Sequence, residues 1–200
     1  MDLQLFDIGK RYAKHWLFRH IEIRLSTGEI LSIQGGNGIG KSTLMQIIYG
    51  FVEPTEGQVM VNGHELKSPH QLFSYTGPYM ELPLSCSIKE LYELYHNAHK
   101  IACAFDVFFN YMQLAYDANA PIQHMSSGQL QKLKTALCFC SNAPVLLLDE
   151  PLSNIDQAGE EWYKNCLGNL KDKIVIIAGN YEHEFSSAQK HLDLRLYKAF

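Results

Sequence analysis

Short aliphatic segments alternate with segments of helical periodicity along most of the chain. Apolar and polar residues alternate over 21–26, which predicts a strand with one buried face. Aliphatic runs at 30–33, 145–148 and 174–178 predict strands that are buried on both faces, as parallel strands usually are. Because helices are expected between these runs, the pattern predicts an α/β fold with a largely parallel central sheet.

The other apolar positions recur at helical spacing. Residues 88–118 carry such positions without an intervening strand pattern, which predicts two or three helices. Further helices are expected after 126–128 and around 160–170. We therefore expect one domain over residues 1–200, with a helical subdomain inserted into its core at about 80–140.

Composition and charge narrow the class of protein. The chain has 200 residues, of which 46% are hydrophobic and 19% charged, close to the norms of a folded domain. The formal net charge of −4 gives no indication of a broad basic surface, so no nucleic-acid partner is expected. The aliphatic runs are far shorter than the roughly 20 residues of a membrane-spanning helix. Acidic Asp2 and Asp7 with no early apolar stretch argue against a signal peptide, and the cytosol is the expected compartment.

The cysteines and histidines give no sign of a metal centre built from protein ligands alone. The five cysteines are odd in number and include no C-x-x-C pair, which argues against a disulfide framework and a structural zinc site. None of the nine histidines forms an H-x-H or H-x-x-x-H pair. We interpret the cysteines as small buried hydrophobic residues.

A glycine-rich loop that follows the strand at 30–33 fits the pattern G-x-x-x-x-G-K-[ST]. The loop and the position after it read Gly35, Gly36, Asn37, Gly38, Ile39, Gly40, Lys41, Ser42 and Thr43. A predicted helix follows, which is the context that a phosphate-binding loop requires. Glycines let successive N–H groups converge on an anion, Lys41 supplies a mobile charge for the β- and γ-phosphates, and the Ser42 hydroxyl can ligate Mg²⁺. The loop predicts binding of a nucleoside triphosphate.

Two carboxylates stand at the end of the buried strand at 145–148. The carboxyl ends of strands are where ligands bind in open α/β sheets. Asp149 is placed to hold Mg²⁺ directly or through water. Glu150 would point to the opposite face from Asp149 if the strand geometry persists, and it can polarise an attacking water. Together with Lys41, Glu150 is therefore a candidate catalytic residue.

Further segments make the chain resemble the ATPase domain of the ATP-binding cassette (ABC) family. Met125–Gln129 reads Met-Ser-Ser-Gly-Gln and resembles that family's signature, usually Leu-Ser-Gly-Gly-Gln. Ser153–Asp156 resembles its D-loop. Tyr12 resembles the aromatic residue on which adenine stacks, with Trp16 as the competing candidate. The resemblance implies a P-loop NTPase with a RecA-like core, an N-terminal antiparallel β-subdomain and a helical signature subdomain.

The resemblance also implies cofactors and partners. In this family two copies sandwich two ATP molecules with Mg²⁺, so that residues of one copy face the nucleotide bound by the other. The residues that match this role here are Ser126, Ser127, Gly128, Gln129 and Asp156. The implied partner is a separately encoded membrane permease that docks near 80–84 and holds the ATPase, as a homo- or heterodimer, at the inner face of the cell membrane. The short chain resembles the small haem-exporter-like subgroup.

Two positions depart from the family pattern. Where the family has a glutamine that senses Mg²⁺ and water, this chain has Tyr79, or Pro78 if the gap is placed differently. Where the family has a histidine, Asn180 stands here, with His183 as a possible substitute. An asparagine can donate a hydrogen bond but carries no charge. We therefore expect ATP to bind normally and to be hydrolysed slowly, with Asn180 as a weakened catalytic contact.

Two other functions remain open from the sequence. The first is a regulatory ATP-binding subunit with vestigial hydrolysis, suggested by Tyr79 and Asn180. The second is a non-transport ABC ATPase that works on ribosomes or DNA. Translation factors of that kind carry two cassettes, and the DNA-repair kind inserts a long coiled coil for which this chain has no heptad array between Ser42 and Ser126.

Overall fold

The computed structural model describes residues 1–66, 72–78, 80–98, 100–180, 182–185 and 187–198. Its strands are β1 (Asp2–Tyr12), β2 (His15–Ser26), β3 (Ile30–Gln34), β4 (Glu56–Val61), β5 (His64–Glu65), β6 (Phe73–Thr76), β7 (Val145–Asp149), β8 (Ile174–Ala178) and β9 (Lys190–Asp193). Its helices are α1 (Lys41–Tyr49), α2 (Ile88–Asn97), α3 (Phe105–Met112), α4 (Ser127–Phe139) and α5 (Gln157–Gly168), with short 3-10 helices η2 (Ile122–His124), η3 (Glu182–Phe185) and η4 (Leu194–Tyr197).

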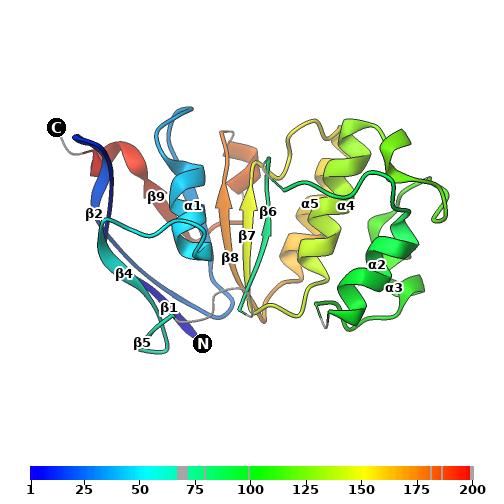
Figure 1. Ribbon diagram of the computed structural model, residues 1–200, viewed down its shortest axis with the longest axis horizontal. Coiled ribbons are helices and arrows are strands. Elements are labelled where there is room, and N and C mark those ends of the chain that lie inside the picture. The colour runs from blue at the N-terminus through cyan, green and yellow to red at the C-terminus, as the bar shows by residue number, and fades with distance from the viewer. Residues whose placement is uncertain (67–71, 79, 99, 181, 186, 199–200) are drawn as a thin grey trace.

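A parallel sheet forms the middle layer of the molecule. Its strand order is β6-β7-β8-β3-β9, and each of these neighbours pairs in parallel. Helix α1 and the N-terminal strands lie on one side of the sheet, and α4 and α5 cover the other, with α2 and α3 further out (Figure 1). The prediction of an α/β fold with a largely parallel central sheet is confirmed.

The side chains of the central strands alternate between two hydrophobic clusters. In β7, Leu146 and Leu148 pack with the helices α2 to α5, whereas Val145 and Leu147 pack with α1 and the N-terminal strands. All four are buried. Because both faces of the sheet are covered, these strands need continuous aliphatic runs. Polar side chains can follow at the carboxyl ends of the strands, where ligands bind in such sheets.

The N-terminal strands form a separate antiparallel sheet with the order β2-β1-β4-β5. A tight turn joins β4 to β5, in which Asn62 and Gly63 have positive φ values of 50° and 78°. Such a turn suits the twist of an antiparallel hairpin. This sheet matches the antiparallel β-subdomain that the ABC resemblance implies.

Helices α2, α3 and α4 lie between β6 and β7 in the chain, where the sequence predicts only helices. Two of them begin with a capping box: Ser87 with Glu90 at α2, and Ser126 with Gln129 at α4. Each box satisfies two N–H groups that a helix start otherwise leaves unpaired. Within the described residues, no helix combines the length and the apolar character that a membrane crossing requires.

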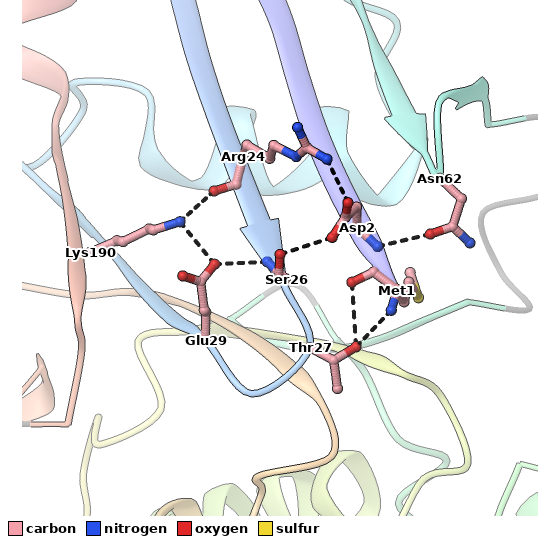
Figure 2. Close-up of polar contacts among 8 residues, drawn as sticks. All are labelled: Met1, Asp2, Arg24, Ser26, Thr27, Glu29, Asn62 and Lys190. Atoms are coloured by element: carbon pink, nitrogen blue, oxygen red, sulfur yellow. Dashed lines mark hydrogen bonds and ion pairs between the residues drawn. The ribbon is translucent and has the colours of Figure 1, made fainter.

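A polar cluster joins the two sheets where β9 meets β2 and β1 (Figure 2). Lys190 Nζ donates to the carbonyl oxygen of Arg24 at 2.7 Å and to Glu29 Oε2 at 2.8 Å. The same Glu29 oxygen accepts the Ser26 N–H at 2.7 Å. Asp2 accepts from the Arg24 guanidinium and from the Ser26 hydroxyl. The cluster therefore ties a core strand to both long strands of the antiparallel sheet.

This cluster should make stability depend on pH. The Lys190 ammonium and then the Ser26 N–H lower the pKa of Glu29 from its ordinary 4.5. A carboxyl with a lowered pKa stabilises the fold above its unfolded pKa and loses that contribution as the pH falls through its folded pKa. We expect Lys190→Met to lower the free energy of unfolding by about 0.5 kcal/mol at pH 7 and by less below about pH 4. Urea unfolding at both pH values measures this difference, and an equal loss at both would contradict the assignment.

Candidate nucleotide-binding site

The predicted phosphate loop connects β3 to α1. Gly35 and Gly40 have φ values of 141° and 116°, in a region that favours glycine. A Cβ at Gly40 would lie 2.8 Å from the Leu17 side chain, so β2 packs directly on the loop. Helix α1 has no side-chain hydrogen bond at its N-cap and no acidic residue in its first turn. Its first N–H groups therefore face the loop as donors for an anion.

The Lys41 side chain is held in the middle of this loop. Its Nζ donates to the carbonyl oxygens of Gly35 at 2.8 Å and Gly36 at 3.3 Å, and to Asn180 Oδ1 at 2.8 Å. Lys41 is only 6% exposed. Burial lowers the pKa of Lys41, and the negative charges of Glu150 and Asp149 oppose that shift. The loop thus presents a positive charge beside the helix start.

Asp149 ends strand β7 next to the loop and is fully buried. Tyr75 donates its hydroxyl to Asp149 Oδ2 at 3.2 Å. Burial raises the pKa of Asp149, and the hydroxyls of Ser42 and Tyr75 oppose that shift. Asp149 Oδ1 is buried and has no hydrogen-bond partner among the described residues. A buried carboxylate oxygen without a donor, next to a serine hydroxyl, is the donor set that Mg²⁺ prefers, so these residues fit the metal.

Glu150 lies just beyond the end of β7, where the extended geometry stops. Its φ is 51°, and its N–H donates to the carbonyl of Ala178 in β8 at 2.7 Å. Because the strand ends at Asp149, simple alternation no longer fixes the direction of Glu150. Instead, Asn180 Nδ2 donates to Glu150 Oε1 at 3.1 Å. The amide of Asn180 therefore joins the Lys41 ammonium to the Glu150 carboxylate.

Three residues of the site were not found from the sequence. The first is Tyr75. The strand register is the signal that could have found it, because Tyr75 pairs with Leu147 and therefore lies on the same face as Asp149. The second is Glu184, only 3% exposed, which accepts the backbone N–H of Asn180 at 2.8 Å. The third is Gln131, which donates to the carbonyl of Glu150 at 3.4 Å. Tyr75 and Gln131 reach the site from other segments of the chain, where no local sequence pattern predicts such contacts. Glu184 follows Asn180 by four residues but stands in no motif that indicates its contact.

The signature segment forms the start of α4. Ser126 Oγ accepts the Gln129 N–H at 3.2 Å, and Gln129 Oε1 accepts the Ser126 N–H at 3.0 Å. A Cβ at Gly128 would lie 2.5 Å from the carbonyl oxygen of Asn154, so the D-loop packs against the signature. Asp156 Oδ1 accepts the Gly159 N–H at 2.8 Å and caps α5. Contacts of this surface with a nucleotide in a second copy stay a prediction.

The two aromatic residues near the β1–β2 hairpin, Tyr12 and Trp16, differ in the contacts that their rings make. The Trp16 ring is contacted by the guanidiniums of Arg11 and Arg19, at 5.1 and 4.2 Å from its centroid. Tyr12 is 53% exposed, and Lys10 Nζ lies 5.1 Å from its ring centroid. This exposure favours Tyr12 over Trp16 as the platform for a base, which stays a prediction.

The structure describes only some of the residues at the two positions that depart from the family pattern. Asn180 lies just beyond β8 and contacts both Lys41 and Glu150, as described above. Tyr79 lies outside the described residues, and so does the side chain of His183. The assignment of the glutamine position to Tyr79 or Pro78, and of the histidine position to Asn180 or His183, stays a prediction.

A glycine loop lies between a parallel strand and a helix, and a buried aspartate ends another strand of the same sheet. Together these features define a P-loop nucleotide-binding protein. The family described as ABC transporter matches residues 18–153. The chain belongs to this family, whose ATP-binding proteins are ATPases coupled to transport. The ABC resemblance read from the sequence is confirmed.

Individual relatives agree with this assignment. The chain is 28% identical over 202 residues to the cytochrome c biogenesis ATP-binding export protein CcmA of Agrobacterium fabrum, covering 95% of this chain and 94% of that protein. It is 28% identical over 172 residues to the zinc import ATP-binding protein ZnuC of Psychrobacter arcticus, covering 85% and 68%. A solved structure described as an ABC transporter ATP-binding protein from Pyrococcus furiosus covers 100% of both chains with a TM-score of 0.89 at 22% identity, which supports the fold.

The loop geometry predicts different effects of alanine at two of its glycines. Gly40→Ala adds a Cβ at φ 116° and 2.8 Å from Leu17, whereas a Cβ at Gly36 meets nothing within 4 Å. We expect Gly40→Ala to lower the free energy of unfolding by about 1–3 kcal/mol and Gly36→Ala by less than about 0.5 kcal/mol. Urea unfolding measures both, and equal losses would show that the loop conformation is not as described.

Proposed function

We propose that this chain is the ATP-hydrolysing subunit of an ABC transporter, which binds ATP with Mg²⁺ and drives a separately encoded membrane permease through ATP-dependent dimerisation. One observation carries the proposal: Lys41, Asp149 and Glu150 come together at the carboxyl end of one parallel sheet. These groups bind a triphosphate, hold a metal and activate water, respectively. Membership of the ABC transporter family supports the coupling to transport.

The roles of the residues follow from their chemistry. The loop N–H groups, the start of α1 and the Lys41 ammonium hold the β- and γ-phosphates. Ser42 and Asp149 would hold Mg²⁺, which neutralises charge on the phosphate oxygens when bound. Glu150 accepts the hydrogen bond of the attacking water and orients it toward the γ-phosphate. Ser126 to Gly128 of a second copy would bring another helix start to the same phosphate.

Slow hydrolysis is supported by the contacts of Asn180. Its Oδ1 accepts from Lys41, and its Nδ2 donates to Glu150. Both ends of the amide are therefore engaged with the protein, and the amide carries no charge for the γ-phosphate. Loss of one contact to the transition state costs about 10²-fold in rate. The sequence departure at Tyr79 or Pro78 acts in the same direction, because neither side chain offers a glutamine amide.

The permease would dock in a cavity of about 500 Å³ between β6, α1 and α2. Its wall is aromatic and includes Tyr49, Phe51, Phe73, Tyr75 and Tyr95. Met80 and Glu81, from the segment expected to dock a partner, also line it. An apolar cavity with a few polar groups suits a short amphipathic helix of the permease. Such docking would hold the chain at the inner face of the cell membrane.

Alignment over nearly the full length of two relatives supports a place near the haem-exporter-like subgroup. The CcmA proteins of Agrobacterium fabrum and Haemophilus influenzae align with this chain over 94% and 97% of their own lengths. The match with the ZnuC protein of Psychrobacter arcticus covers 68% of that protein. A regulatory subunit with vestigial hydrolysis is the second candidate, because the engaged Asn180 amide also suits a protein that binds ATP without turning it over.

Single-turnover hydrolysis separates these functions. We expect the wild type to hydrolyse ATP more slowly than about 1 s⁻¹, and Glu150→Gln to be at least about 10-fold slower at similar ATP affinity, because the variant loses the group that activates water. Equal rates would instead establish the vestigial subunit. Turnover above about 1 s⁻¹ would contradict slow hydrolysis. With ATP, Glu150→Gln should dimerise in analytical ultracentrifugation, and with ADP it should not.

The proposed stacking of the ATP base on Tyr12 can be tested separately from hydrolysis. We expect Tyr12→Ala to raise the Kd for ATP about 10-fold, which is within the range for loss of one aromatic stack. Trp16→Ala serves as the matched control, because that ring is already contacted by Arg11 and Arg19. Titration of each variant with a fluorescent ATP analogue gives the Kd. A larger effect at Trp16 than at Tyr12 would reverse the assignment.

A further inference from the structure

Tyr75 belongs to two sites at once. Its ring lines the aromatic cavity beside β6, and its hydroxyl donates to Asp149 Oδ2 at 3.2 Å. The other oxygen of that carboxylate, Oδ1, is the one without a hydrogen-bond partner among the described residues. The phenol therefore holds one oxygen of Asp149 and leaves the other for the metal.

The ring of Tyr75 is in turn held by the aromatic wall of the cavity. Tyr49 and Phe51 contact it edge-on, with ring centroids 6.0 and 6.3 Å away and interplanar angles of 63° and 87°. Phe51 is 65% exposed, so a partner in the cavity can reach it. Edge-to-face contacts depend on ring orientation, and a shift of Phe51 changes the packing of Tyr75.

Gly77 is what allows the approach of Tyr75 to Asp149. A Cβ at Gly77 would clash with the Tyr75 hydroxyl and would lie 2.9 Å from Asp149 Cβ. Any other residue at this position would push the phenol away from the carboxylate. The contact therefore depends on three neighbouring features: the β6 register, this glycine and the aromatic wall.

We infer that Tyr75 is a positioning residue that links occupation of the aromatic cavity to the metal-binding oxygen of Asp149. The inference rests on the proposed function, which supplies the metal and the occupant of the cavity. The chain has no glutamine between Gln71 and Gln113, the region where the ABC resemblance expects one that senses Mg²⁺ and water. The inferred link runs from the cavity wall through the Tyr75 phenol to the Asp149 carboxylate.

The test measures how ATP binding depends on Mg²⁺, rather than the rate of ATP hydrolysis. Binding of a fluorescent ATP analogue is measured while Mg²⁺ is titrated, in the wild type and in Tyr75→Phe, which keeps the ring and removes the hydroxyl. We expect the Mg²⁺ midpoint to rise about 5-fold in Tyr75→Phe, the size expected for one lost hydrogen bond, and affinity in EDTA to stay unchanged. Tyr92→Phe is the matched control, because its hydroxyl donates to the Cys103 carbonyl at 2.8 Å, away from this site, and its midpoint should not move.

A double-mutant cycle tests the link to the cavity. We expect Phe51→Ala to shift the Mg²⁺ midpoint about twofold in the wild type and not at all in Tyr75→Phe, because the shift requires the hydroxyl. Equal shifts in both backgrounds, or an unchanged midpoint in Tyr75→Phe, would overturn the inference while leaving ATP binding intact. A wild type whose ATP affinity does not respond to Mg²⁺ would overturn the proposed metal site itself.

Discussion

The site depends on the burial of two opposite charges at one end of a parallel sheet. Lys41 is 6% exposed and Asp149 is fully buried, although charged groups in an interior lose their hydration. The fold compensates with specific partners: carbonyl oxygens and the Asn180 amide for the ammonium, and the hydroxyls of Tyr75 and Ser42 for the carboxylate. These partners come from the glycine loop, the start of α1, strand β6 and the segment after β8.

The same sheet brings the candidate nucleotide site and the proposed docking cavity close together. Strand β6 is at the edge of the parallel sheet, next to β7. Tyr75 in β6 lines the aromatic cavity, and Asp149 ends β7 beside the phosphate loop. One residue can therefore touch both regions without a long chain of contacts. Coupling between two sites needs an element that both can bias, and here a single side chain is placed to act as that element.

The sequence predicts the parts of the structure that have local causes. The aliphatic runs at 145–148 and 174–178 match β7 and β8 because a strand buried on both faces needs apolar residues throughout. The glycine loop and the Ser126 capping box are likewise local patterns. Contacts that depend on tertiary packing could not be predicted. Asn180 joins Lys41 to Glu150 only because three separate segments converge after the sheet has formed. Glu184 is local to Asn180 and accepts its backbone N–H, but no sequence pattern indicates that contact.

The hydrogen bonds that hold the Lys41 ammonium have a consequence for ligand selectivity. Three oxygen atoms of the protein compete with any incoming ligand for this one cation. In the proposed function, a polyphosphate tail concentrates several negative charges within a few ångströms and would displace all three oxygens together. A nucleoside or a monophosphate brings less charge to this cation, so the loop would favour nucleotides with a longer phosphate tail before the base is recognised.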